Sequence, residues 1–221
     1  MAWGSDDTLF AASKNGENIK LEREIDSNNA NLVDDSGSNL LHYGVESNMR
    51  SVMKILIDNG ANLNTINNAG DTPLMHAIKL GFDVSAAELI KAGADISILD
   101  KRKFPAFYYS LLSQNEKTSL HFIKAGQKPI IFSDGNTSIH MLSAFAKRKL
   151  LKRALKSKKL LNKKNNDGHT PLDIATKNDN SVAITHLLNQ GASIERSYLN
   201  GGYLIVQSII NKNIKLLIEI L

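Results

Sequence analysis

The segment "NAGDTPLMHAIKLGFDVSAAELIKAGADI", from Asn68 to Ile96, contains the signals for two short helices and for the turns that bound them. The hydroxyl of Thr72 suits a helix N-cap because it accepts from the free amides of the first turn. Pro73 follows at the first helical position, where no amide donor is needed. A second apolar segment ends before Gly93, and glycine readily takes the left-handed conformation that ends a helix. The segment therefore predicts a helix–turn–helix unit followed by a loop.

The unit is copied along the chain. "GDTPLMHA" from Gly70 has a close counterpart in "GHTPLDIA" from Gly168, and looser counterparts start at Gly37, Lys103, Gly135 and Gly201, so successive starts lie 32 or 33 residues apart. The position four residues after each start is apolar in every copy: Leu41, Leu74, Phe107, Ile139, Leu172 and Ile205. Because two short helices cannot bury their apolar faces alone, neighbouring copies must stack into a one-dimensional core.

A 33-residue period with Thr-Pro-Leu, a small residue soon after it and Gly-Ala closing the second helix resembles the ankyrin repeat. The resemblance implies an all-α solenoid of about six to seven repeats that forms a single domain over residues 1–221. The repeats would be anchored near residues 4, 37, 70, 103, 135, 168 and 201. "DTLFAASKNGE" is similar to a weakened first copy. The last copy is incomplete at Leu221 and ends on apolar residues, so we expect a fragment of a longer protein.

The stretch "NNDGHTPLDIA", from Asn165 to Ala175, brings together a carboxylate, an imidazole and a hydroxyl, the groups from which active sites are built. The register assigns Gly168, Thr170, Pro171, Leu172 and Ala175 to the fold, and Asp173 to a position where the family usually has histidine. No histidine pair has metal-binding spacing, and no phosphate-binding glycine loop or nucleophile elbow is present. We therefore expect no catalytic residue, no metal site and no cofactor in this chain.

The resemblance implies that a partner protein meets the concave side, which the turn tips and the outward faces of the first helices form. Four large apolar residues fall on positions of that surface, and such patches seldom stay free on soluble monomers. The alternative is that divergent copies bury them. The predicted partner-binding residues are Lys79, Leu80, Arg102, Phe104, Leu112, Phe145, His169 and Lys177.

One basic block dominates the charge. Residues 147–164 hold ten basic residues and no acidic one, and removing these ten charges from the net +5 leaves −5 for the rest of the chain. Leu150, Leu151 and Leu155 belong to core columns, so the block's cations face away from the core. Three readings stay open: a solvated helix face, a nuclear-import-like address, or a surface for an acidic protein, anionic lipid or nucleic acid, with Lys147, Arg148, Lys149, Lys152, Arg153 and Lys156 as its binding residues.

Composition narrows the function class. The chain has no cysteine, which excludes disulfides and thiolate metal sites and is compatible with a reducing compartment. No apolar run approaches the length of a membrane span, and no signal peptide is visible. We expect a monomeric, non-enzymatic protein-interaction module, cytoplasmic or secreted into a host-cell cytosol, since the composition resembles ankyrin-repeat effectors of intracellular bacteria. The alternatives are a non-catalytic targeting part of a larger enzyme and an electrostatic binder of anionic lipid or nucleic acid.

Overall fold

The computed structural model describes residues 5–155 and 160–193, and within these it contains twelve helices. The chain divides into two compact units, which are described separately. The first holds residues up to 110 together with 117–125, and the second holds 111–116 together with the residues from 126 onward.

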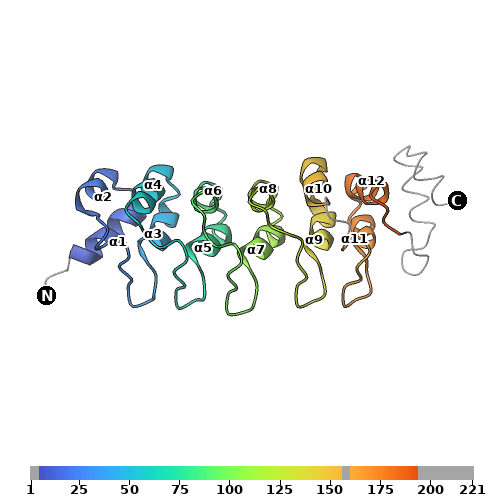
Figure 1. The fold of residues 1–221 in the computed structure, drawn as a ribbon, viewed down its shortest axis with the longest axis horizontal. Helices are drawn as coiled ribbons and strands as arrows, with labels where there is room; N and C mark the ends of the chain where they lie inside the picture. Colours follow the sequence, from blue (N-terminus) through green and yellow to red (C-terminus); the bar gives the residue numbers. More distant parts are fainter. Residues whose placement is uncertain (1–4, 156–159, 194–221) are drawn as a thin grey trace. The chain divides into compact units, whose positions relative to one another are not determined.

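The first unit is built from helix pairs that are joined by tight turns. The pairs are α1 (Ser5–Asn15) with α2 (Asn18–Glu24), α3 (Leu40–Ser47) with α4 (Arg50–Asp58), α5 (Pro73–Lys79) with α6 (Asp83–Lys91), and α7 (Ala106–Leu112) with α8 (Glu116–Lys124). Of the last pair, Leu111, Leu112 and Glu116 belong to the second unit. In Figure 1, α1, α3 and α5 lie in one row, α2, α4 and α6 lie in a second row, and the long loops extend away from both. Helix α3 packs against α1 and α5, and α4 packs against α2 and α6, so each copy contacts its neighbours as a stacked repeat requires.

The second unit repeats this arrangement with two described pairs. They are α9 (Ser138–Phe145) with α10 (Arg148–Ala154), and α11 (Pro171–Lys177) with α12 (Ser181–Asn189). Helix α9 packs on α11, and α10 packs on α12. The first helices of the two copies therefore stack on each other, and so do the second helices.

The local signals read from the sequence are confirmed in both units. The hydroxyl of Thr72 accepts from the backbone N–H of Met75, and Thr170 caps α11 in the same way. Gly60 follows the end of α4 and takes the left-handed conformation, with a φ of +83°. Lys103 occupies the position where the other described copies start with glycine, and it takes the same left-handed conformation, with a φ of +66°. The degenerate third copy thus keeps the turn although its sequence has lost the glycine.

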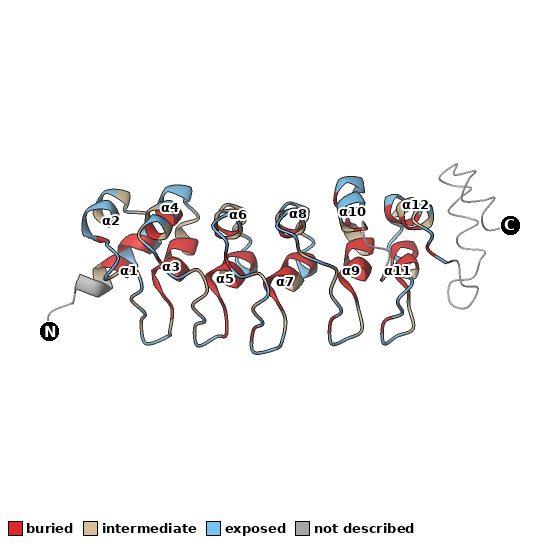
Figure 2. Ribbon diagram, in the orientation of Figure 1, coloured by how far each residue is buried: buried red, intermediate tan, exposed pale blue. Residues whose placement is uncertain are grey.

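The core follows the predicted columns (Figure 2). Leu41, Leu74, Phe107, Ile139 and Leu172 are all buried, with at most 3% of each side chain exposed. In the second helices the apolar column at Ile57, Ile90, Ile123 and Leu188 is only half-buried, and the residue before it in each helix is fully buried, as Leu56, Leu89, Phe122 and Leu187 show. One residue turns a helix by about 100°, so the preceding residue faces the stack more directly.

The weakened first copy is present as expected. Helix α1 buries Leu9 and Ala12, and Gly16 ends it with a φ of +76°. The predicted repeat at Gly201 lies outside the described residues, and the single domain over residues 1–221 stays a prediction. None of the described helices is long and apolar enough to cross a membrane.

Candidate protein-binding surface

The turn tips of the first unit are held rigid by one side chain each. Asp100 accepts from the backbone N–H groups of Arg102 and Phe104, both at 2.9 Å. Asp34 and Asn67 make the same two bonds to the residues two and four positions later, at 2.8 to 3.0 Å. Since these side chains satisfy backbone donors that a loop would otherwise leave to water, each tip presents its outer residues in one defined conformation.

The two acidic residues of this set, Asp34 and Asp100, also bind a tyrosine of the following first helix. The hydroxyl of Tyr43 donates to Asp34 at 2.6 Å, and Tyr109 donates to Asp100 in the same manner. The bond to Asp34 raises the pKa of Tyr43 to about 12, and burial together with the bond to Asp100 raises the pKa of Tyr109 to about 12. Burial by itself would raise the pKa of Asp100, but the donors around it outweigh burial and lower that pKa. The pairs tie each turn to its helix.

Aromatic rings and two cations gather at the third turn, and we call Lys79, Arg102, Phe104, Tyr108 and Tyr109 the third-turn cluster. The rings of Phe104 and Tyr108 stack with their centroids 4.0 Å apart, and Tyr108 meets Tyr109 edge-on at 5.5 Å. Lys79 Nζ lies 4.5 Å from the centre of the Tyr109 ring, and the guanidinium of Arg102 lies 5.5 Å from that of Phe104. The cluster combines the residue types that dominate protein interfaces, and its members hold one another in place.

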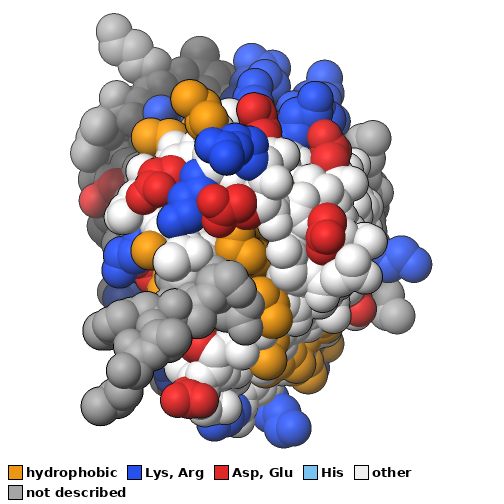
Figure 3. Space-filling view, turned by 90° about the vertical axis from the view of Figure 1, so that its left-hand side faces the viewer, with side chains coloured by type: hydrophobic (Ala, Val, Ile, Leu, Met, Phe, Trp, Pro, Cys, Tyr) orange, Lys and Arg blue, Asp and Glu red, His pale blue; other side chains and the backbone are white. Residues whose placement is uncertain are grey.

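Charges of both signs line the neighbouring first helices. Lys79 Nζ forms an ion pair with Asp71 at 2.5 Å, while Glu46 contacts Lys14 at 2.8 Å and His76 at 3.5 Å. Figure 3 looks onto the N-terminal end of the chain and shows acidic, basic and hydrophobic side chains interspersed there. This unit therefore offers mixed polar contacts instead of a field of one sign.

A column of exposed apolar side chains, which sequence analysis did not select, runs along the loops. Val33, Ile66 and Leu99 lie four residues before successive starts in the first unit, and they are 55%, 52% and 49% exposed. Ile131 has the equivalent position in the second unit. Val33 and Leu99 each pair through an isolated bridge with the residue before a first helix. The 33-residue spacing was visible in the sequence, but none of these positions belongs to the predicted partner-binding residues.

The predicted partner-binding residues lie in both units. In the first unit, Lys79, Leu80 and Arg102 are exposed and Phe104 is half-buried by its stacking. In the second unit, Leu112 and Lys177 are exposed, and Phe145 and His169 are half-buried. Leu80 and Leu112 keep 44% and 58% of their surface open, so local rearrangement of the divergent copies has not buried them. That the four apolar residues act as one patch stays a prediction.

The basic block has its leucines inside and its charges outside. Leu150, Leu151 and Leu155 are buried, and Lys147, Arg148, Lys149, Lys152 and Arg153 are exposed. Lys156 lies outside the described residues. The predicted direction of the charges, away from the core, is confirmed for the described cations.

The stretch from Asn165 to Ala175 uses its polar groups to hold the fold. Asp173 accepts from both the backbone N–H and the hydroxyl of Thr170, at 2.8 and 2.9 Å, and so completes a capping box. The carbonyl of His169 contacts Nε2 of His140 at 2.9 Å, which links two copies. His42 makes the equivalent contact to the carbonyl of Asp71. Burial lowers the pKa of both His42 and His140.

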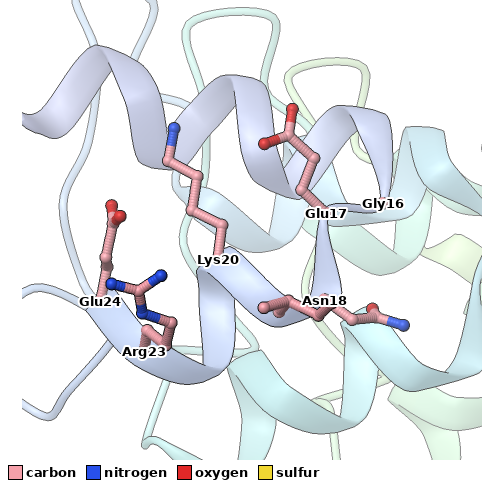
Figure 4. Close-up of a pocket in the computed structure, with 7 residues that line it drawn as sticks. Gly16, Glu17, Asn18, Lys20, Arg23 and Glu24 are labelled. Atoms are coloured by element: carbon pink, nitrogen blue, oxygen red, sulfur yellow. The ribbon is translucent and has the colours of Figure 1, made fainter.

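Two further kinds of site, a metal site and a ligand pocket, were considered in the described residues. The described residues contain no group of three or more histidine, aspartate and glutamate side chains placed to hold a metal ion. An open hollow of about 650 Å³ lies beside α2 and the turn that precedes it, lined by residues 16–20, Arg23 and Glu24. Figure 4 shows the charged ends of Glu17, Lys20 and Arg23 spread around this hollow instead of converging on one point. The geometry gives no reason to assign it a ligand.

The family follows from comparison with known proteins. The family described as "Ankyrin repeats (3 copies)" matches residues 9–100, and the one described as "Ankyrin repeat" matches residues 167–197, so the matches together cover more than half of the chain. The chain belongs to the ankyrin-repeat family. Ankyrin repeats are in general protein–protein interaction modules and are typically non-catalytic.

Relatives and solved structures agree with the family. A fowlpox virus (strain NVSL) ankyrin-repeat protein is 27% identical over 180 residues, which are 80% of this chain and 42% of the viral protein. An ankyrin-repeat domain from Acinetobacter baumannii AYE is 22% identical with a TM-score of 0.72, over 86% of this chain and all of that one. A chain from a complex of a Bdellovibrio bacteriovorus predatory endopeptidase with an immunity protein is 24% identical with a TM-score of 0.58, over 82% and 96%. The ankyrin-repeat chain spans less than half the length of the curated relatives it matches.

Proposed function

We propose that this ankyrin-repeat chain is a non-catalytic module that binds a partner protein on the turn tips and first helices of its first unit. The observation that carries the proposal is the third-turn cluster, together with the exposed column of Val33, Ile66 and Leu99 on the loops of the same unit. Aromatic and arginine side chains supply most of the energy in protein interfaces, and exposed apolar side chains around them exclude water on binding.

The hydrogen bonds of the turn tips favour the same function. Each tip is already held by an acidic or amide side chain, as Asp100 holds the third. A surface that is ordered before binding loses less conformational entropy when a partner arrives. The partner would meet a nearly fixed array of side chains, and the mixed charges at Glu46, His76 and Lys79 would select its orientation.

The nature of the partner is open to two further proposals. The Asn-, Ile- and Lys-rich composition and the degenerate copies favour a host protein as the target of a delivered effector. The short span relative to the curated relatives favours the alternative, in which the chain is the targeting part of a larger protein. Both proposals use the same surface, so one experiment tests what they share.

The test compares two double variants, each of which replaces two exposed apolar side chains by serine. Ile66→Ser with Leu99→Ser removes two members of the exposed column, whereas Ile19→Ser with Val182→Ser removes two exposed apolar side chains from α2 and α12. Proteins retained from lysate by the unaltered chain are identified by mass spectrometry, purified and titrated against each variant. We expect affinity to fall only with the Ile66 and Leu99 pair. Equal losses with both pairs, or no loss with the first, would contradict the proposal.

A further inference from the structure

Helix α10 carries a compact group of cations on one side. Arg148, Lys149, Lys152 and Arg153 are exposed, and they occupy positions i, i+1, i+4 and i+5, which share one face of a helix. The apolar residues of the same helix, Leu150 and Leu151, are buried. We call the four cations the α10 ridge.

Within the part of the chain that the structure describes, no ion pair neutralises the positive charge of the α10 ridge. Neither α10 nor the neighbouring α12 contains an acidic residue, and within the described residues none of the four cations forms an ion pair. A nearby carboxylate, that of Glu116, accepts from the backbone N–H of Lys147 at the start of the helix. On α12, burial lowers the pKa of His186, and the charges of Arg148 and Lys152 lower it further. The ridge and the adjacent surface therefore lie in a positive potential.

The second helices of the first unit show what an ordinary solvated face looks like in this protein. There Arg50 of α4 pairs with Glu88 of α6 at 2.8 Å, and Lys117 of α8 lies 3.7 Å from Asp83 of α6. These two cations each have an acidic residue on a neighbouring copy. Within the described residues none of the four ridge cations has an acidic ion-pair partner, and the carboxylate of Glu116 bonds the backbone at Lys147, so the α10 ridge differs from that face.

We propose that the α10 ridge docks on the surface of a bilayer that contains anionic phospholipids. Clustered Lys and Arg side chains suffice for such binding, because each cation near an anionic membrane raises partitioning by about fivefold. The four cations share one side of one short helix, so they can approach a flat surface together. This inference concerns the second unit and does not depend on the protein-binding surface of the first.

Two other kinds of polyanion fit the ridge less well. A stable protein partner needs desolvated apolar or aromatic anchors, and the leucines of α10 are buried. Single-stranded nucleic acid is held by bases that stack on aromatic side chains, and neither α10 nor α12 contains an aromatic residue. The ridge offers positive charge without apolar or aromatic anchors, and electrostatic attraction to anionic lipid headgroups needs only that charge.

The experiment measures sedimentation of the full chain with vesicles of phosphatidylcholine, with and without phosphatidylserine. The test variant is Lys149→Glu with Arg153→Glu. The matched control is Lys91→Glu with Lys124→Glu, which changes the net charge by the same amount at exposed lysines of α6 and α8. A further variant, Lys149→Gln with Arg153→Gln, removes the charges without adding acids and guards against misfolding, which circular dichroism checks.

We expect the unaltered chain to sediment with phosphatidylserine vesicles at low ionic strength and not with phosphatidylcholine alone. The Lys149 and Arg153 variants should lose at least about twentyfold in partitioning, while the control keeps most of it. High salt should release the protein. The proposal is overturned if the unaltered chain ignores phosphatidylserine, if both charge-reversal pairs lose equally, or if single-stranded RNA at equal phosphate concentration binds the ridge more tightly than the vesicles do.

Discussion

The third-turn cluster and the α10 ridge are both rich in cations, yet their surroundings differ in kind. Lys79 lies between the carboxylate of Asp71 and the ring of Tyr109, and Arg102 lies near the Phe104 ring. Within the described residues, none of the ridge cations forms an ion pair. The cluster therefore has a defined shape that a partner protein can match. The ridge offers a positive electrostatic potential instead. Different copies of the repeat thus carry two kinds of surface, and the groups next to each cation set the difference.

The largest effect is expected from the core on which both surfaces depend. Leu74→Ala in the first unit and Leu172→Ala in the second should each lower the free energy of unfolding by roughly 2–5 kcal/mol, because each leaves a cavity between copies. Urea denaturation measures the change. Leu80→Ala, at an exposed position, is the control and should shift stability by less than about 0.5 kcal/mol. An unchanged midpoint for Leu74→Ala would mean that the repeat register is wrong.

The next effect separates the cluster from the ridge by their sensitivity to salt. Phe104→Ala should weaken partner binding by on the order of thirtyfold, because an aromatic anchor can contribute about 2 kcal/mol to an interface. The loss should be the same at low and high ionic strength when affinity is measured by calorimetry. Charge reversal at Lys149 and Arg153 should leave that affinity nearly unchanged. The opposite ranking of the two changes would remove the case for the protein-binding surface.

A smaller effect concerns the rigidity of the third turn. Tyr109→Phe removes the hydrogen bond to Asp100 and should cost about 1–3 kcal/mol of stability, and less at Tyr43, which is half-buried. Because the folded pKa of both tyrosines is about 12 and the ordinary value is 10, their contribution is present below pH 10 and is lost as pH rises towards 12. Ultraviolet titration of the two Tyr→Phe variants checks this. Tyrosines that all titrate near 10 would contradict it.

The smallest effect compares equivalent histidines of the two units. Burial lowers the pKa of His42 and His140 below the ordinary 6.5, so the unfolded chain binds more protons just below that pH. Stability should therefore be fully present above pH 6.5 and fall as the solution is acidified through the lowered folded values. Proton NMR titration of the two rings measures this. A pKa above 6.5 for either ring would show that its bond to the next turn holds the charged form.

Much of the fold was predictable because its signals are local and copied. Thr72 and Pro73 start a helix whatever surrounds them, and the apolar column through Leu74 recurs at a fixed interval. Lys103 shows the limit of local reading. Its side chain gives no reason for a left-handed backbone, and only the register and the stacking of neighbouring copies explain its φ of +66°.

For the candidate surfaces, the sequence predicted which residues are exposed but not which side chains contact one another. Exposure of Leu80 and Lys79 follows from where they fall in the copy. The stacking of Phe104 on Tyr108 and the placement of Lys79 over Tyr109 do not, since they join side chains through specific rotamers. The exposed column through Ile66 was not predicted, because it lies on the loops, outside the turn tips and first helices to which the resemblance assigned partner contacts.

By itself the sequence determined the helix pairs, their 33-residue register, the inward direction of the leucines and the separation of the basic block from the rest of the chain. These properties depend on residues that are neighbours along the chain. Only the tertiary structure decided which charges are paired between copies, because those pairs join side chains more than 30 residues apart. Glu88 of α6 forms an ion pair with Arg50, which neutralises the charge of that arginine. Arg148 lies near α12, which has no acidic residue, so the positive charge there is not offset by that helix.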